Sequence, residues 1–102
     1  MSTFELVIRE KAQQQILDIY SYYEDLQPGL GDRFEAELDL FFDLLEQGPR
    51  QFQAVDKVFR RAHLQTFPYT LFYFVLESRV YLVAVWPQAG KSDAWLEVID
   101  PF

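Results

Sequence analysis

The side chains best suited to chemistry form a short basic stretch in the second half of the chain. Arg60 and Arg61 are the only adjacent pair of basic residues, and His63 follows two positions later. Basic side chains can activate a hydroxyl group or stabilise negative charge at a phosphate. On a strand, successive side chains point to opposite faces, so Arg61 and His63 would share a face that excludes Arg60. Two explanations of the arginine pair stay open. Either the pair binds a partner, or one arginine forms a salt bridge to a helix carboxylate while the other is solvated.

The pattern around these residues predicts neither catalysis nor metal binding. His63 has no second histidine, thiolate or carboxylate at a ligand spacing, so it is better explained as a hydrogen-bonded residue. Four carboxylates recur at helical spacing opposite an apolar stripe, which is typical of a solvated face; they are Glu35, Asp39, Asp43 and Glu46. Phosphate-binding glycine loops and nucleophile motifs do not occur. We therefore expect no metal, no cofactor and no catalytic residue.

The composition is that of one small folded domain. The chain has 102 residues, half of them apolar and 18% aromatic, which provides enough apolar surface for a packed core. Cysteine is absent, which excludes disulfides and thiolate metal sites. The formal net charge is −7, and the acidity is concentrated in residues 1–56, whereas residues 57–102 have a slight basic excess. This acidity argues against direct binding of nucleic acid.

The first half of the chain predicts one strand followed by two helices. Residues 4–9 alternate as expected for an edge strand. From Lys11 to about Leu26, apolar residues recur every three or four positions, which predicts an amphipathic helix. The pattern resumes after Pro28-Gly29, where the proline suits the first turn of a helix, and it stops at Gly48-Pro49. We expect an antiparallel helical hairpin, with Glu37 on the outer face of the second helix.

Three runs rich in aromatic and β-branched residues follow the polar link: residues 58–66, 69–76 and 80–86. Their short connections favour antiparallel hairpins, with a register that could shift by one residue. The predicted fold class is α+β in the order β-α-α-β-β-β, with a helical hairpin packed on an antiparallel sheet, and residues 1–102 form a single domain. Both faces of residues 69–76 are apolar, whereas the hairpin can cover only one. The other face needs the C-terminal segment, a second subunit or a different protein.

Three stretches of the chain resemble the RelE/ParE toxin superfamily, and specifically its ParE-like, plasmid stabilisation members. They are Ile19 to Tyr23 (IYSYY), Pro28 to Phe34 (PGLGDRF) and Arg60 to Tyr73 (RRAHLQTFPYTLFY), of which the last is the most specific. The resemblance spans nearly the whole chain and implies the RelE/ParE-like fold. It also implies the toxin of a type II toxin–antitoxin system, whose partner is a cognate antitoxin with an extended or helical tail that wraps the toxin.

The two branches of this superfamily act on different targets. RelE-like members cut messenger RNA on the ribosome, whereas ParE-like members inhibit DNA gyrase. The RelE-like mechanism implies an arginine where this chain has Gln65, and a tyrosine near the position of Trp95. Glutamine carries no positive charge, and tryptophan cannot act as an acid or a base. RNA cleavage by the family mechanism is therefore not expected, and we expect a binding protein rather than an enzyme.

The resemblance to ParE-like members also directs attention to the C-terminal segment. Many of these proteins close the last strand with a histidine, followed by two arginines, a proline and a tryptophan. In this chain only Trp95 fits that pattern, because the other places hold Trp86, Gln88, Ala89 and Lys91. These departures weaken the expectation of gyrase inhibition. The candidate residues for binding a partner or target are Arg60, Arg61, His63, Trp86, Gln88, Lys91 and Trp95.

The leading hypothesis is a ParE-like toxin that binds an antitoxin and, as a candidate target, DNA gyrase. Two alternatives stay open. One is a ribosome-dependent endoribonuclease that uses Arg60 or Arg61, His63 and Lys91 in a shifted arrangement. The other is a non-toxic family remnant that keeps the partner-binding surface, and a homodimer is a further option. The first ten residues do not form a basic leader, and no apolar run reaches the roughly 18 residues of a membrane span, so we expect a cytoplasmic protein that does not contact a membrane.

Overall fold

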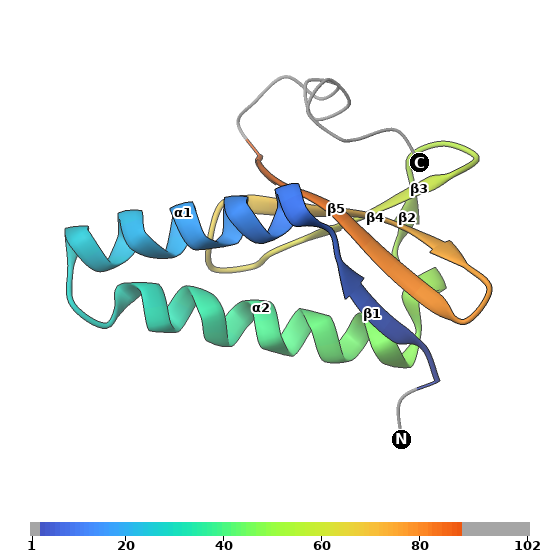
Figure 1. Cartoon of the computed structure of the whole chain (residues 1–102), viewed down its shortest axis with the longest axis horizontal. Helices are drawn as coiled ribbons and strands as arrows, with labels where there is room; N and C mark the ends of the chain where they lie inside the picture. Colours follow the sequence, from blue (N-terminus) through green and yellow to red (C-terminus); the bar gives the residue numbers. More distant parts are fainter. Residues whose placement is uncertain (1–2, 89–102) are drawn as a thin grey trace.

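The computed structural model describes residues 3–88, which form two helices packed on a five-stranded sheet (Figure 1). In chain order the elements are β1 (Glu5–Ile8), α1 (Glu10–Leu26), α2 (Leu30–Gln47), the 3-10 turn η1 (Pro49–Gln51), β2 (Gln53–Ala54), β3 (Phe59–His63), β4 (Tyr69–Leu76) and β5 (Arg79–Pro87). The predicted class and element order are confirmed. The two-residue strand β2 was not predicted, because the residues of this link are mostly polar and show no alternation.

The sheet is mixed rather than antiparallel, which corrects the sequence prediction. Its strand order is β1-β5-β4-β3-β2, and β1 runs parallel to β5 while every other neighbour is antiparallel. The main chain joins β1 to β5 at both ends, through Glu5 N–H to Ser78 O at 2.9 Å and Arg9 N–H to Leu82 O at 3.0 Å. A helical hairpin separates β1 from the other strands, so no tight turn dictates its direction and a parallel partner is allowed.

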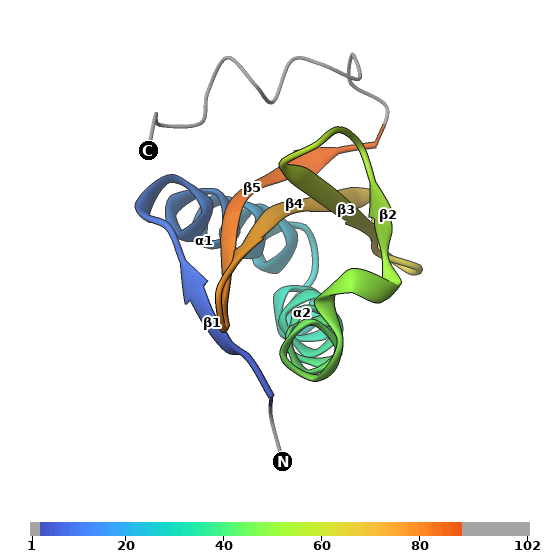
Figure 2. The ribbon, with the colours of Figure 1, turned by 90° about the vertical axis from the view of Figure 1, so that its right-hand side faces the viewer.

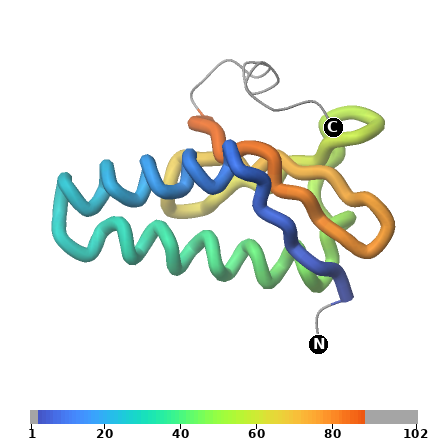
Figure 3. The backbone as a smooth tube through the Cα atoms, viewed as in Figure 1, coloured from blue at the N-terminus to red at the C-terminus, as the bar shows by residue number. Residues whose placement is uncertain are grey.

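The two helices run side by side as the predicted antiparallel hairpin (Figure 3). Gly29 precedes α2 with φ of 90°, a left-handed conformation that glycine adopts at little cost. Pro28 therefore lies before the turn residue and not in the first turn of α2. Gly48 N–H donates to Leu44 O at the other end of α2, as the Gly48-Pro49 pair predicts.

The main core lies between the helical hairpin and the sheet. Phe34, Leu38 and Leu45 of α2 are buried against Leu71 of β4 and Leu82 of β5. Figure 2 looks nearly along the helices and shows the sheet curving around them from β1 to β2. Neither helix is long and apolar enough to cross a membrane, among the residues described.

Glu37 does not lie on the outer face of α2, where the sequence pattern assigned it. Its carboxylate accepts the main-chain N–H groups of Gln65 and Thr66 at 2.9 Å and of Phe67 at 3.1 Å. These three donors belong to the turn between β3 and β4. Glu37 therefore holds that turn against the helix, and charge-assisted hydrogen bonds of this kind are stronger than neutral ones.

The sheet face opposite the helices, here called the second sheet face, carries its own cluster of buried side chains. Its members are Phe59, Phe72, Phe74, Val83 and Ala84. Phe74 stacks on Tyr81 with ring centroids 4.8 Å apart. This cluster confirms the prediction that β4 is apolar on both faces, because the neighbouring residues Leu71 and Tyr73 are buried on the helix side.

Candidate partner-binding surfaces

Three of the predicted site residues lie on the second sheet face: Arg61, His63 and Trp86. His63 of β3 pairs with Thr70 of β4, and Thr70 pairs with Trp86 of β5, so the three residues form a row across the sheet. Arg61 lies on the same face, two residues before His63 on β3, and it pairs with Phe72 of β4. The period-two spacing that placed Arg61 and His63 on one face therefore holds in the structure.

The polar groups of this row are arranged for hydrogen bonding. His63 Nδ1 lies 2.6 Å from the hydroxyl oxygen of Thr70, which is buried. Partial burial of the imidazole, together with the nearby charge of Arg61, lowers the pKa of His63 below its usual value of 6.5. The imidazole is therefore mainly neutral at pH 7. A neutral ring held on a threonine can accept or donate a hydrogen bond, which suits recognition of a partner.

Arg60 lies on the opposite face and stabilises the chain itself. It pairs across the sheet with Tyr73, whose side chain is in the main core. Its guanidinium donates to Phe52 O at 2.7 Å and to Arg50 O at 3.2 Å, and the Tyr73 hydroxyl donates to Pro49 O at 2.6 Å. Both side chains therefore hold the segment that leads from α2 into β2.

Arg61 also contacts this segment, but through a side chain. Its Nε and Nη2 donate to the Oε1 of Gln53 at 3.2 and 3.0 Å. Among the contacts described, neither arginine pairs with a helix carboxylate, which was one of the two explanations left open: Arg60 binds carbonyl oxygens and Arg61 binds an amide. Arg61 nevertheless stays partly exposed on the second sheet face, where a partner can reach it.

The remaining predicted site residues belong to the end of β5 and the chain beyond it. Gln88 N–H donates to Pro68 O at 2.9 Å, and its side-chain amide donates to Tyr69 O at 2.8 Å and Leu64 O at 3.2 Å. Gln88 therefore fastens the end of β5 to the β3–β4 hairpin. Lys91 and Trp95 lie outside the described residues.

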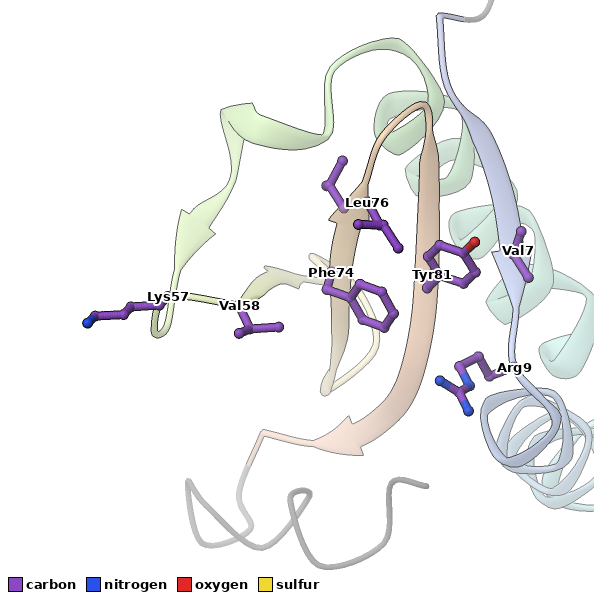
Figure 4. A pocket seen from close by; sticks show the side chains of 8 residues that line it. Val7, Arg9, Lys57, Val58, Phe74, Leu76 and Tyr81 are labelled. Atoms are coloured by element: carbon purple, nitrogen blue, oxygen red, sulfur yellow. The ribbon is translucent and has the colours of Figure 1, made fainter. Parts of the chain in front are cut away.

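A shallow apolar groove of about 620 Å³ occupies the other end of the second sheet face (Figure 4). We call it the second-face groove. The rings of Phe74 and Tyr81 lie side by side on its floor, between Val58 and Val7. Val58 and Leu76 are each more than half exposed to solvent, which is unusual for large apolar side chains that line one groove. This groove has the character of a binding surface for an apolar segment.

The described part of the chain offers no metal site. No group of three His, Asp or Glu side chains converges within residues 3–88. The carboxylates of α2 that the sequence assigns to a solvated face are exposed or partly exposed; they are Glu35, Asp39, Asp43 and Glu46.

The second-face groove was not predicted residue by residue. Val7 lies on it because β1 turns Leu6 and Ile8 toward the helices, and the alternation of residues 4–9 contains that information. Val58 precedes β3 and Leu76 ends β4, so their exposure depends on where the strands stop. Sequence periodicity does not define strand ends well, which is why these two residues were missed.

Comparison with known proteins gives a family match and a structural likeness. Residues 6–91 match the model of a family described as ParE toxin of type II toxin-antitoxin system, parDE. No curated protein matches the chain. Among solved structures, a chain described as belonging to the chromosomal ParDE TA system from P. aeruginosa has a similar fold, with a TM-score of 0.73. The likeness covers 83% of this chain and 96% of that one at 17% sequence identity, so it concerns the fold.

Proposed function

Because the chain belongs to the ParE toxin family of type II toxin–antitoxin systems, we propose that it acts by binding a cognate antitoxin and, when the antitoxin is absent, DNA gyrase. The family match over residues 6–91 is the observation that carries this proposal. The structure adds support, because an apolar groove and a row of hydrogen-bonding side chains lie on the sheet face opposite the helices.

The second-face groove is the proposed surface for the antitoxin. Its floor is the stacked pair Phe74 and Tyr81, and its rim carries the exposed Val58 and Leu76. Aromatic and aliphatic groups at the centre of an interface contribute most of the binding free energy when a partner removes them from water. An antitoxin segment with an apolar face would cover these four side chains.

The row of His63, Thr70 and Trp86, with Arg61 beside it, is the proposed contact for the target. These residues combine an aromatic ring, an imidazole and a guanidinium on one face of the sheet. Tryptophan and arginine are the side chains most often found at the energetic centre of interfaces. Lys91 and Trp95 follow β5 in the sequence, and we propose that they extend the same contact.

The proposed function is tested by inducing the chain in a bacterial host with and without the product of the adjacent antitoxin reading frame. We expect growth arrest without the antitoxin, intact messenger RNA, loss of supercoiling by purified gyrase, and recovery of growth when the antitoxin is supplied. Arrest with cleaved messenger RNA would instead support the ribosome-dependent endoribonuclease. Unaffected growth would identify a family remnant that keeps only the partner surface.

A further inference from the structure

A second hollow lies between α2 and β3, near the edge of the sheet that β2 forms. Its volume is about 560 Å³. We call it the edge notch, and it is defined by an apolar floor and a polar rim: Leu40, Leu44 and Phe52 on the floor, and Gln53, Arg61 and His63 on the rim. Leu40 is 60% exposed, whereas Leu44 and Phe52, which line the notch with it, are partly buried.

The main chain of β3 is only partly paired along this notch. β2 pairs with Arg61 and Arg60 alone, because the chain before Gln53 turns away through η1. Leu64 N–H donates to Tyr69 O, so the backbone groups of Leu64 point toward β4. Alternation along the strand then directs the N–H and C=O groups of His63 outward, past the end of β2. His63 thus presents a strand edge that no described strand covers.

The chemistry of the notch indicates what can fill it. Its floor is apolar, its rim carries amide, imidazole and guanidinium groups, and no acidic side chain lines it. Arg61 therefore gives the notch a positive charge on a chain whose formal net charge is −7. An occupant with carboxylates would be attracted to this point and repelled by most of the remaining surface.

We propose that a short extended segment of the antitoxin, with an apolar side chain next to a carboxylate, pairs with the outer edge of β3 at His63 and seats in the edge notch. This inference rests on the proposed antitoxin binding and adds a second point of attachment, apart from the second-face groove. The main-chain bonds hold the segment, the floor buries its apolar side chain, and Arg61 receives its carboxylate. Strand addition at a free sheet edge is a general mode of peptide recognition.

Amide hydrogen exchange on the free chain and on its purified complex with the antitoxin tests the pairing. We expect the His63 amide to exchange at least about tenfold more slowly in the complex, since it gains a main-chain partner. The Ala62 amide points toward β4 and serves as the internal control, protected in both samples. A stable complex with unchanged exchange at His63 would overturn the inference and leave the proposed function intact, whereas failure to form any complex would overturn both.

Two variants that place opposite charges at Leu40 test the chemistry of the occupant. Leu40→Glu should weaken antitoxin binding about tenfold or more, while Leu40→Lys should weaken it far less, because only the glutamate repels a carboxylate in the notch. Leu17→Glu and Leu17→Lys are the matched controls, since Leu17 is 52% exposed on α1 and does not line the notch. Equal losses of antitoxin affinity for the two Leu40 variants would overturn an acidic occupant.

A second copy of this chain is the other occupant that the exchange experiment detects. If exchange of the His63 amide slows as the concentration of the chain rises without antitoxin, a second copy fills the notch and the inference is overturned.

Discussion

Gly31, in the first turn of α2, donates its main-chain N–H to the side-chain carboxylate of Glu24 on α1 at a distance of 2.8 Å. A carboxylate at this position satisfies a helix N-terminal donor and interacts favourably with the helix dipole. The contact also brings the two helices very close together. A Cβ atom on Gly31 would lie 2.6 Å from Glu24 Cγ and 2.7 Å from Tyr20 O.

Replacing this glycine should therefore destabilise the protein. In an unconstrained helix interior, Gly→Ala adds about 1 kcal/mol of stability. For Gly31→Ala we expect the opposite sign, a loss of about 1–3 kcal/mol, because the backbone oxygen of Tyr20 cannot move without separating the helices. Urea unfolding of the two proteins measures the difference. A variant as stable as the wild type would show that the hairpin is not closely packed at this point.

The three hydrogen bonds from the β3–β4 turn to Glu37 predict a second stability effect. Glu37→Ala would remove the acceptor of three main-chain N–H groups, and we expect a loss of about 1.5–3 kcal/mol in the free energy of unfolding. Glu35→Ala is the matched control on the same helix, since Glu35 is exposed and should change stability by less than about 0.5 kcal/mol. Equal effects of the two substitutions in urea unfolding would contradict the role of Glu37.

The tyrosines predict a loss of stability at alkaline pH. Burial, and then a hydrogen bond with Tyr23, raise the pKa of Tyr69 to about 12, while the Asp32 carboxylate raises the pKa of Tyr20 to about 12. Burial also raises the pKa of Tyr73. A raised pKa in the folded state gives stability that is complete below the unfolded pKa of 10 and is lost as pH rises from 10 toward 12.

Two measurements check this prediction. Absorbance at 295 nm should show part of the tyrosines of the folded protein titrating well above pH 10, whereas all of them titrate near pH 10 in denaturant. The free energy of unfolding should be flat from pH 8 to 9.5 and then fall. Tyr69→Phe should make that fall shallower. Identical titration curves in the folded and denatured protein would contradict the partial burial of Tyr69 and the full burial of Tyr73.

Side chains of the proposed target contact should affect toxicity without affecting folding. Arg61→Ala and Trp86→Ala remove groups from the second sheet face, and we expect each to reduce growth inhibition at least about tenfold in inducer dose. Arg33→Ala is the control, because Arg33 is exposed on α2, which lies on the other side of the sheet. If growth arrest is unchanged in both Arg61→Ala and Trp86→Ala, the target binds another surface. Trp95→Ala then tests the C-terminal segment separately.

Periodicity in the sequence was sufficient to predict both helices and four of the five strands, whereas it left the register of the hairpins open. The apolar stripe of α2, for example, is buried at Phe34, Leu38 and Leu45 as its spacing requires. The parallel pairing of β1 could not be predicted, because strand direction depends on where the helical hairpin returns the chain and not on local residue types. The strand β2 was missed since two residues are too few for any alternation.

The candidate site was predictable in part, and the reason is physical. Alternation correctly separated Arg60 from Arg61 and joined Arg61 to His63. The sequence could not show what each side chain binds, because that depends on tertiary contacts. In the structure, Arg60 and Gln88 bind main-chain carbonyl groups of the chain itself. One local signal was overlooked, since Glu37 falls within the apolar stripe three residues after Phe34, and a carboxylate there needs buried donors.

The most direct test of the central claim is a calorimetric titration of the purified chain with the antitoxin encoded beside it. We predict saturable binding with a Kd in the nanomolar range, about −11 to −12 kcal/mol. The heat capacity change should be negative, because the second-face groove buries apolar surface in the complex. Absence of saturable binding at about 10 μM, where a Kd of 1 μM would already be visible, would contradict the account.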